Sequence, residues 1–414
     1  MAASSTVTNS DNFAGSIPIK WQTELLKVAA GYLVADKFAN TEVMAPATGD
    51  RVRLNKVLRP AKQTTASTAG TLIASTSAKS LTSNYMDLVM ETWGDSFGFN
   101  EDVSIQSIIQ DPKIKEVIAN QMARSLDYQV IKRMSTEGLR IRNDGDTTLM
   151  KSFTVDGLSN GSGTPTTIQF SDVSAFTADS DDTWNGGFAC FTAPGGPAYD
   201  ECRQVDDNDQ GNETIVMAAA DAFTQAPTTD SSGIITVGTD IAATDVFTAS
   251  NIATMAAHHE YLQTEKFEGG LIRCFLHSAQ KADLWTDTGF TNSATYDDSG
   301  RFKNYSIIRW LDNEFMVSSE IYREDVDGTE NQSTGIVYVA PFFGKNSYSV
   351  VRFGNTGAGS KFGVEFIPVF GADSQNLRKS AKWLSWKGNF AAGVTRATSC
   401  IGLMTGATDL GIIV

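Results

Sequence analysis

A polar tract of small residues separates two alternating runs, and no other sequence feature constrains the fold as strongly. Residues 51–58 alternate polar with apolar side chains, and residues 85–99 do the same. Between them, residues 61–83 consist largely of Thr, Ser, Ala and Gly. Because a period of two is typical of strands, we predict that residues 41–100 form an extended hairpin. A hairpin with so little core of its own would gain its burial from a neighbouring subunit.

One internal segment carries the whole charge imbalance. The chain has 414 residues, with 33 Lys and Arg against 48 Asp and Glu, which gives a formal net charge of -15. Residues 143–250 contain 17 acidic residues against only Lys151 and Arg203, so the remainder is neutral. This balance excludes a protein that binds nucleic acid through a generally basic surface. Short alternating runs at 166–170 and 233–237 predict a small acidic β-domain inserted into a larger body.

The rest of the chain shows helical and strand patterns in turn. Asp111 and Pro112 favour the start of a helix and Gly138 its end. At about 1.5 Å per residue, this helix would be roughly 35–40 Å long. Further helices are predicted at residues 20–39, 249–266 and 278–285. Strands are predicted at residues 271–276, 307–311, 314–320, 336–340, 348–353 and 362–370. The body is therefore expected to be α+β.

No secretion signal or membrane segment is expected. The first 13 residues have neither a basic nor an apolar region, and no stretch approaches the roughly 20 apolar residues that span a bilayer. The four cysteines are Cys190, Cys202, Cys274 and Cys400. Without a CxxC pair they predict no zinc site, and we expect buried thiols in a reducing compartment. A bridge between Cys190 and Cys202 across a hairpin is the alternative.

The histidines do not predict a metal centre. His258 and His259 are adjacent, so they face different sides of their helix and cannot easily chelate one ion. His277 directly precedes a predicted helix, where a capping or hydrogen-bonded imidazole is expected. Residues 157–161 (GLSNG) have the pattern of a nucleophile elbow but lack the helix that must follow the serine.

Two further motifs also lack their required context. Residues 354–359 (GNTGAG) precede a strand, so no helix N-terminus is available for a dinucleotide. Residues 206–211 (DDNDQG) resemble the start of a calcium loop, but Met217 stands where the closing Glu belongs. We therefore predict an exposed acidic turn there. No catalytic, metal-binding or cofactor-binding residue is assigned, no cofactor is expected, and the chain is predicted not to be an enzyme.

Four segments follow one another in an informative order. They are residues 85–103 (YMDLVMETWGDSFGFNEDV), the predicted helix 111–138, 275–278 (FLHS) with 283–285 (DLW), and 383–394. Together they resemble the major capsid proteins of tailed bacteriophages, in particular the N-four-like podovirus branch. Where that family usually has His-Pro, this chain has His277 and Ser278. The resemblance covers about two thirds of the chain and omits most of the acidic segment.

The resemblance implies the Hong Kong-ninety-seven-type capsid fold and gives each segment a role. Residues 1–40 would be the N-terminal arm, 41–100 the extended loop, 101–142 the spine helix of the peripheral domain, 143–250 an inserted acidic β-domain, and 251–414 the axial domain with the remainder of the peripheral domain. It also implies self-assembly into hexamers and pentamers that close into an icosahedral shell around double-stranded DNA. Scaffold protein, portal and, where one exists, a decoration protein would be partners. The protein would be located in the virion after assembly in the cytoplasm of the bacterial host.

Charged side chains of the extended loop are the predicted inter-subunit contacts. They are Arg51, Arg53, Lys56, Arg59, Lys62, Lys79, Asp87, Glu91 and Asp95. Opposite charges on the two strands can pair within the hairpin or with a neighbouring subunit, and the sequence leaves both possibilities open.

Three other classes of protein remain as alternatives. A structural or adhesive β-rich surface protein would need a secretion route. An encapsulating nanocompartment would bind cargo inside its shell. A cytosolic enzyme would gather polar side chains with shifted pKa values in a concave site.

Overall fold

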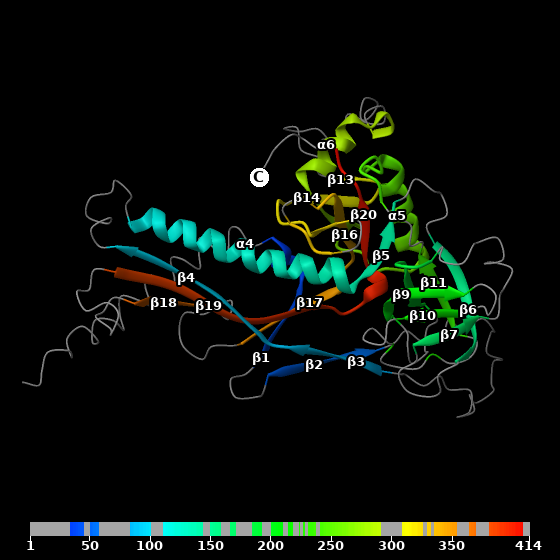
Figure 1. Ribbon diagram of the computed structural model, residues 1–414, viewed down its shortest axis with the longest axis horizontal. Helices are drawn as coiled ribbons and strands as arrows, with labels where there is room; N and C mark the ends of the chain where they lie inside the picture. Colours follow the sequence, from blue (N-terminus) through cyan, green and yellow to red (C-terminus); the bar gives the residue numbers. More distant parts are fainter. Residues whose placement is uncertain are drawn as a thin grey trace, which may run out of the picture. The chain divides into compact units, whose positions relative to one another are not determined.

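Figure 1 shows a computed structural model of the chain, in which helices and sheets both occur. The structure describes residues 34–44, 50–57, 83–100, 111–143, 150–158, 166–170, 184–192, 200–209, 214–217, 223, 227, 231–236, 241–290, 309–325, 329–332, 335–353, 364–369 and 381–408. The predicted α+β class is confirmed. The chain divides into two compact units. The first comprises residues 1–53, 87–130 and 349–393, and the second comprises residues 54–86, 131–348 and 394–414.

The first unit is built on a five-stranded sheet. Its strands are β1 (Asn40–Met44), β4 (Glu91–Asn100), β17 (Tyr348–Phe353), β18 (Val364–Val369) and β19 (Ala381–Val394). Their order is β1-β17-β19-β18, and β4 also pairs with β19. β1 runs parallel to β17, whereas β18 and β4 run antiparallel to β19. The alternating run at 85–99 therefore belongs partly to this sheet.

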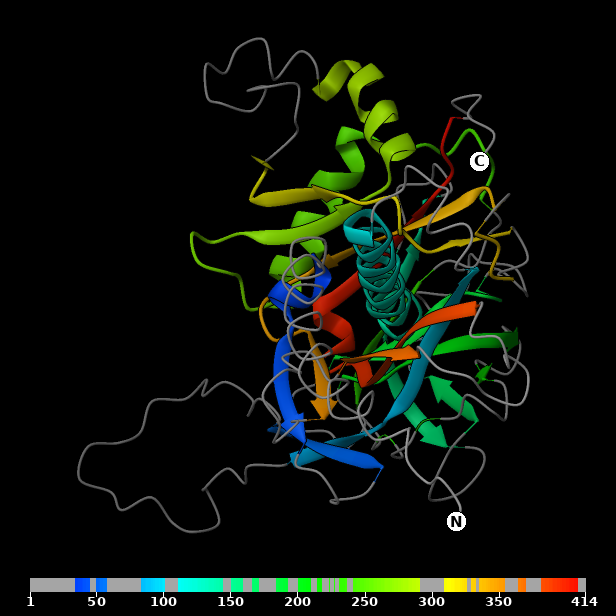
Figure 2. The same ribbon diagram turned by 90° about the vertical axis from the view of Figure 1, so that its left-hand side faces the viewer.

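The predicted long helix is α4 (Asp111–Glu137), and its bounds agree with the capping signals in the sequence. It lies along β4 and β19, as Figure 1 shows from the side and Figure 2 nearly end-on. Ile118, Met122 and Leu126 recur at helical spacing and are buried. Their burial, rather than helix propensity alone, is what stabilises a helix of this kind.

A glutamine fixes α4 on the sheet of the first unit. Gln121 accepts a hydrogen bond at Oε1 from Trp386 Nε1 of β19 at 2.8 Å. Its Nε2 donates to Asp95 Oδ2 of β4 at 3.2 Å. One side chain thus sets the position of the helix against two strands.

A second contact of α4 orders the start of the described chain. Asp127 accepts hydrogen bonds from the backbone N of Val34 at 2.8 Å and of Ala35 at 3.1 Å. These residues begin the short 3-10 helix η1 (Ala35–Phe38). Of the helix predicted at residues 20–39, the part before residue 34 lies outside the described residues.

The second unit contains a seven-stranded sheet. Its strands are β5 (Leu139–Arg142), β12 (Ile272–Leu276), β13 (Arg309–Trp310), β14 (Asn313–Val317), β15 (Arg323–Glu324), β16 (Val337–Phe343) and β20 (Cys400–Thr405). The order is β13-β14-β12-β16-β20-β5, with β15 paired to β16. The helices α5 (Ala249–Tyr261) and α6 (Ser278–Thr286) and the 3-10 helix η6 (Ala397–Ser399) belong to the same unit. Stacked rings of Phe275 and Phe343, 5.1 Å apart, lie in its core.

A glycine sets the junction between α4 and this sheet. A Cβ at Gly138 would lie 2.4 Å from the carbonyl oxygen of Cys400 and 2.9 Å from that of Met134. Only glycine allows the backbone to approach so closely. β5 follows directly and pairs in parallel with β20. The glycine after the helix therefore also allows β5 to lie close to β20.

A closed six-stranded barrel lies between β5 and α5 in the sequence. Its strands are β6 (Met150–Leu158), β7 (Thr167–Phe170), β8 (Phe188–Phe191), β9 (Cys202–Asp209), β10 (Thr214–Met217) and β11 (Ser232–Thr236), in the order β10-β7-β6-β11-β8-β9. Side chains that alternate along these strands fill the barrel, among them Phe153, Val155 and Phe191, together with Trp184 from the turn before β8. The acidic segment therefore has an apolar core of its own.

Two buried asparagines connect the two ends of the internal segment that forms the barrel. Asn251 Nδ2 donates to Asn143 Oδ1 at 2.9 Å. Asn143 Nδ2 donates in turn to the carbonyl oxygen of Val246 at 3.2 Å. The chain segment that forms the barrel therefore begins, after β5, and ends, at the start of α5, at one place.

The prediction for the cysteines was wrong for one pair. Cys190 and Cys202 form a disulfide, whereas Cys274 and Cys400 are buried thiols. The reason is the register of the barrel: β8 and β9 are antiparallel and place Cys190 directly opposite Cys202. Their separation in sequence allowed such a bridge but could not show that the two residues face each other.

The acidic turn predicted at 206–211 was wrong for residues 206–209, and residues 210 and 211 lie outside the described residues. Asp206 and Asp207 are exposed but lie within β9. Asn208 is buried, and its Oδ1 accepts a hydrogen bond from the backbone N of Trp184 at 2.9 Å. The polar side chain of Asn208 therefore points inward and holds a turn of the barrel. The acidic composition of this run did not predict that role.

The predicted hairpin at 41–100 was wrong in part, because residues 41–44 and 91–100 belong to the five-stranded sheet, and only residues 51–57 and 83–89 form a separate two-stranded sheet. It consists of β2 (Arg51–Val57) and β3 (Ser83–Val89), which pair with each other. At its open end, Met90 N donates to the carbonyl oxygen of Asp50 at 2.8 Å. We call residues 50–57 and 83–90 the ribbon. Residues 58–82, which include the predicted polar tip, lie outside the described residues.

Candidate functional site

A two-pronged ion pair crosses the ribbon. Arg53 of β2 donates from Nε to Oδ1 of Asp87 and from Nη2 to Oδ2, each at 2.7 Å. The planar guanidinium matches both carboxylate oxygens, which gives the pair a fixed geometry. These two side chains are therefore paired within the chain, one of the two possibilities that the sequence left open.

The ion pair changes the titration of the acid. The hydrogen bonds from Arg53 are the largest cause that lowers the pKa of Asp87, and the positive charges of Arg53 and Arg51 add to it. Arg51 itself is exposed and forms no ion pair among the described residues. Arg51 therefore acts on Asp87 through its charge but is not a member of the two-pronged pair.

The exposed face of the ribbon combines this pair with apolar side chains. Tyr85 and Val89 are 44% and 47% exposed, and they share a face with Asp87 because alternate residues of a strand point the same way. Leu54 and Leu88 are buried. An exposed aromatic and an arginine beside apolar surface are the residue types enriched in protein interfaces.

The other predicted contact residues do not lie together on one face of the ribbon. Lys56 lies near enough to Asp200, outside the ribbon, for its charge to act on that carboxylate. Glu91 and Asp95 belong to β4 in the five-stranded sheet, where Asp95 accepts a hydrogen bond from Gln121. The residues outside the described part of the chain are Arg59, Lys62 and Lys79. A role in binding a neighbouring subunit stays a prediction for all nine residues.

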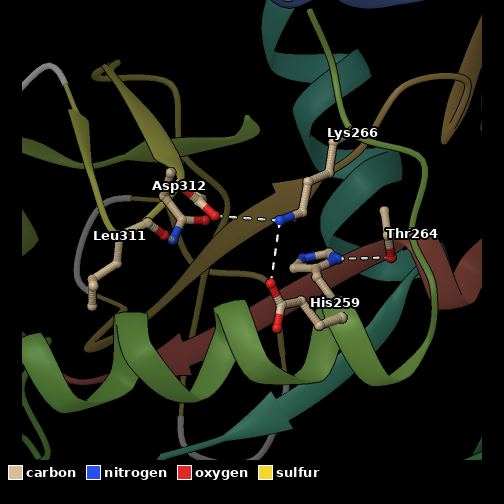
Figure 3. A network of polar contacts seen from close by, with 7 residues as sticks. His259, Thr264, Lys266, Leu311 and Asp312 are labelled. Carbon is tan, nitrogen blue, oxygen red and sulfur yellow. Dashed lines mark hydrogen bonds and ion pairs between the residues drawn. The ribbon is translucent and has the colours of Figure 1, made fainter. Parts of the chain in front are cut away.

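A buried histidine in the second unit belongs to a polar network (Figure 3). His259 Nδ1 lies 3.0 Å from Thr264 Oγ1. Burial is the main cause that lowers the pKa of His259 to about 3, so the imidazole is neutral near pH 7. Beside it, Lys266 Nζ contacts carboxylate oxygens of Glu260 and Asp312, each at 3.4 Å. This network orders the end of α5 against the turn between β13 and β14.

The predicted capping role of His277 is confirmed. Its Nδ1 accepts a hydrogen bond from Ala279 N at 3.2 Å, and Gln280 Oε1 accepts from His277 N at 3.1 Å. Burial is the main cause that lowers the pKa of His277 to about 4. Within the residues that the structure describes, no group of three or more His, Cys, Asp or Glu could hold a metal ion.

Sequence reasoning missed two buried acids in the second unit. Glu324 Oε2 accepts a hydrogen bond from Arg140 Nη2 at 2.5 Å, and Asp200 Oδ1 accepts one from Thr398 N at 2.9 Å. The partners are 184 and 198 positions apart in the sequence. No local pattern signals such pairs, because they depend on which strands become neighbours.

Comparisons with known proteins identify similar solved structures but no family. No protein-family model matches the chain, and no curated protein matches it. The capsid structure of the cyanophage P-SCSP1u is 10% identical, with 91% of this chain and 89% of that chain covered and a TM-score of 0.49. The capsid of Ralstonia phage GP4 is 13% identical, with 90% and 87% covered and a TM-score of 0.47. A virus-like particle from Pyrococcus furiosus is 8% identical, with 94% and 99% covered and a TM-score of 0.41.

The sequence predicts no membrane-spanning segment. Among the described residues, no helix is both long and apolar enough to cross a membrane.

Proposed function

We propose that this chain is a major capsid protein of a tailed bacteriophage, with the Hong Kong-ninety-seven-type fold. The observation that carries the proposal is the ribbon. It is a two-stranded sheet that pairs with no other described strand, and its exposed face bears Tyr85, Val89 and the Arg53–Asp87 pair. A two-stranded hairpin is marginally stable by itself. A second copy of the chain would supply the burial that the ribbon lacks.

The order of elements supports the same proposal. The ribbon is followed by a long helix on a sheet, a barrel, and a second sheet, in the order that the resemblance implies for loop, spine helix, inserted domain and axial domain. Hexamers and pentamers of the chain would close into an icosahedral shell around double-stranded DNA. We place the phage in the N-four-like podovirus branch because of the segments that carry the resemblance in sequence.

The barrel would then be an inserted domain on the outside of the shell. Its sequence carries the acidic excess, which would repel packaged DNA from the inside but is solvated on the outside. Scaffold protein, portal and a decoration protein would be further partners. The protein would act in the virion after assembly in the cytoplasm of the bacterial host.

The mechanism is association rather than catalysis. In a closed shell, one heterologous contact is repeated around every ring, so individually modest contacts sum to a stable particle. Arg51, which is exposed on the same strand as Arg53, would add electrostatic complementarity to a neighbour. The chain would not be an enzyme.

Negative-stain microscopy of the purified protein tests this proposal. We expect rings or shells for the wild type, and loss of both for the double variant Tyr85→Ser/Val89→Ser, because the ribbon would lose its apolar contacts. Tyr261→Ser is the matched control, since Tyr261 is 64% exposed on α5, outside the ribbon, and it should still assemble. A wild type that stays monomeric at high concentration with a crowding agent would overturn the proposal. Shells that co-purify with a cargo protein and never with DNA would favour a nanocompartment.

A further inference from the structure

A buried carboxylate fastens the barrel to the chain segment before β20. Asp200 is 3% exposed. Its Oδ1 accepts hydrogen bonds from both the backbone N and the Oγ1 of Thr398, at 2.9 and 2.5 Å. Thr398 lies in η6, which leads directly into β20 of the seven-stranded sheet. We call this contact the hook.

The hook depends on an unusual backbone conformation. Asp200 has a φ of 66°, in the left-handed region that residues other than glycine seldom adopt. Its backbone N donates to the carbonyl oxygen of Phe191 at 3.0 Å, and Phe191 N donates to the carbonyl oxygen of Glu201 at 3.2 Å. The conformation that aims the carboxylate at Thr398 is therefore fixed by the pairing at the end of β8 against the start of β9.

The disulfide lies next to this pairing. Cys202 is two residues beyond Asp200, and Cys190 precedes Phe191 directly. The covalent bond prevents β8 and β9 from separating or slipping at the position beside the hook. We propose that the Cys190–Cys202 pair is a redox-controlled lock: the disulfide holds Asp200 in the conformation that binds Thr398, and reduction releases the hook.

The reaction is thiol–disulfide exchange with a small-molecule disulfide such as glutathione disulfide. One protein thiolate attacks a sulfur of the reagent, forms a mixed disulfide and expels the first reagent thiolate. The second protein thiolate attacks the protein sulfur of the mixed disulfide, forms the Cys190–Cys202 bond and expels the second. The protein thus loses two electrons and two protons, and the reagent becomes two thiols. Cys190 and Cys202 are buried, so the barrel must open before the reagent can reach them. While the barrel is closed, the cysteines are neither oxidised nor reduced.

Two charges face the hook from other elements. Lys56 of β2 and Arg396 before η6 act on the Asp200 carboxylate and partly offset the effect of burial, which raises its pKa. Both cations favour the ionised carboxylate, the form that accepts both hydrogen bonds from Thr398.

Hydrogen exchange of the full chain tests the lock. The protein is prepared with glutathione disulfide or with dithiothreitol, and alkylation with mass spectrometry counts its thiols, which should be two in the first state and four in the second. We expect the backbone amides of residues 397–399 to exchange about tenfold faster in the reduced state, because local opening no longer breaks a fixed pairing. The variant Cys190→Ala/Cys202→Ala should behave like the reduced protein.

Variants at the hook complete the test. Asp200→Ala should show fast exchange at residues 397–399 in both redox states. Asp206→Asn, which removes an exposed charge from β9, should keep the difference between the states. Equal exchange in the oxidised and reduced wild type would overturn the proposal. Faster exchange of β16 together with the hook would also overturn it, since the disulfide would then stabilise the whole unit. The measurement does not require assembly, so its failure would leave the proposed function standing.

Discussion

Arg140 and Glu324 form an ion pair inside the second unit, with Nη2 of the arginine 2.5 Å from Oε2 of the glutamate. Their side chains are only 10% and 1% exposed. The Arg140 guanidinium also lies over the ring of Phe188 in the barrel, 5.4 Å from its centroid. The Arg140 side chain of β5 therefore contacts both β15 and β8, which are far from each other in the sequence.

Removing one member of this pair should be costly. Glu324→Leu leaves a buried guanidinium without its carboxylate and should lower the free energy of unfolding by about 3 kcal/mol. The double variant Arg140→Met/Glu324→Leu should recover most of that loss, because neither charge remains. Denaturant unfolding of the unassembled protein measures both values. The more exposed pair of Lys132 and Glu330 is the control, and Glu330→Ala should cost less than about 1 kcal/mol. If Glu324→Leu and Arg140→Met/Glu324→Leu lowered the free energy of unfolding equally, the loss would not come from an unpaired buried charge.

The ion pair on the ribbon should be visible in an acid titration. The folded pKa of Asp87 lies below its ordinary value of 3.8, so the pair stabilises the ribbon above that pH and is lost as the pH falls through the lowered value. Nuclear magnetic resonance of the Asp87 carboxyl carbon should show its pKa rise toward 3.8 in Arg53→Gln. Lys345→Gln, a loss of positive charge at an exposed site of the second unit, should leave it unchanged. An identical titration of Asp87 in the wild type and in Arg53→Gln would show that the pair does not form in solution.

The buried histidine should make the second unit sensitive to acid. The pKa of His259 is about 3 in the folded chain against an ordinary value of 6.5. The unfolded chain therefore takes up a proton below about pH 6.5 while the folded chain does not. The free energy of unfolding should fall by up to about 1.4 kcal/mol per pH unit from this residue between those values. Unfolding curves between pH 7 and pH 4 should show a shallower pH dependence for His259→Gln than for the wild type. Parallel curves would contradict a neutral, buried imidazole.

The close approach at Gly138 should not tolerate a methyl group. Gly138→Ala would place its Cβ 2.4 Å from the Cys400 carbonyl oxygen, and the backbone would have to shift. We expect a loss of about 2 kcal/mol in the free energy of unfolding. Ser250→Ala, at an exposed position of α5, should change it by less than about 0.5 kcal/mol. Thermal and denaturant unfolding would both serve, and a neutral effect of Gly138→Ala would mean that the junction is less tightly packed than described.

Local signals in the sequence predicted local structure well. Asp111 and Gly138 gave the bounds of α4 because capping acts within a single turn. His277 was placed correctly as a cap because its position before a helix is visible in the sequence. The alternating runs likewise predicted strands, since burial of one face imposes a period of two.

Pairings between distant segments could not be predicted. Cys190 and Cys202 face each other only because β8 and β9 pair in one register, and a shift by one residue would have separated them. Asp95 was expected on the loop, yet β4 pairs with β19 almost three hundred positions further along. Asp200 and Thr398 meet for the same kind of reason. The sequence pattern predicts that each segment is extended, but it does not predict which other strand it pairs with.

The central claim is that the exposed face of the ribbon, residues 50–57 and 83–90, gains its burial from another copy of the chain, whereas β1 and β4 are held by the sheet of their own chain. Electron cryomicroscopy of assembled particles tests it most directly, at a resolution that traces the ribbon in each subunit. We predict that the face bearing Tyr85 and Val89 lies against an adjacent subunit in every ring. A map in which the whole of this segment rests on its own subunit, with no neighbouring copy in contact, would contradict it.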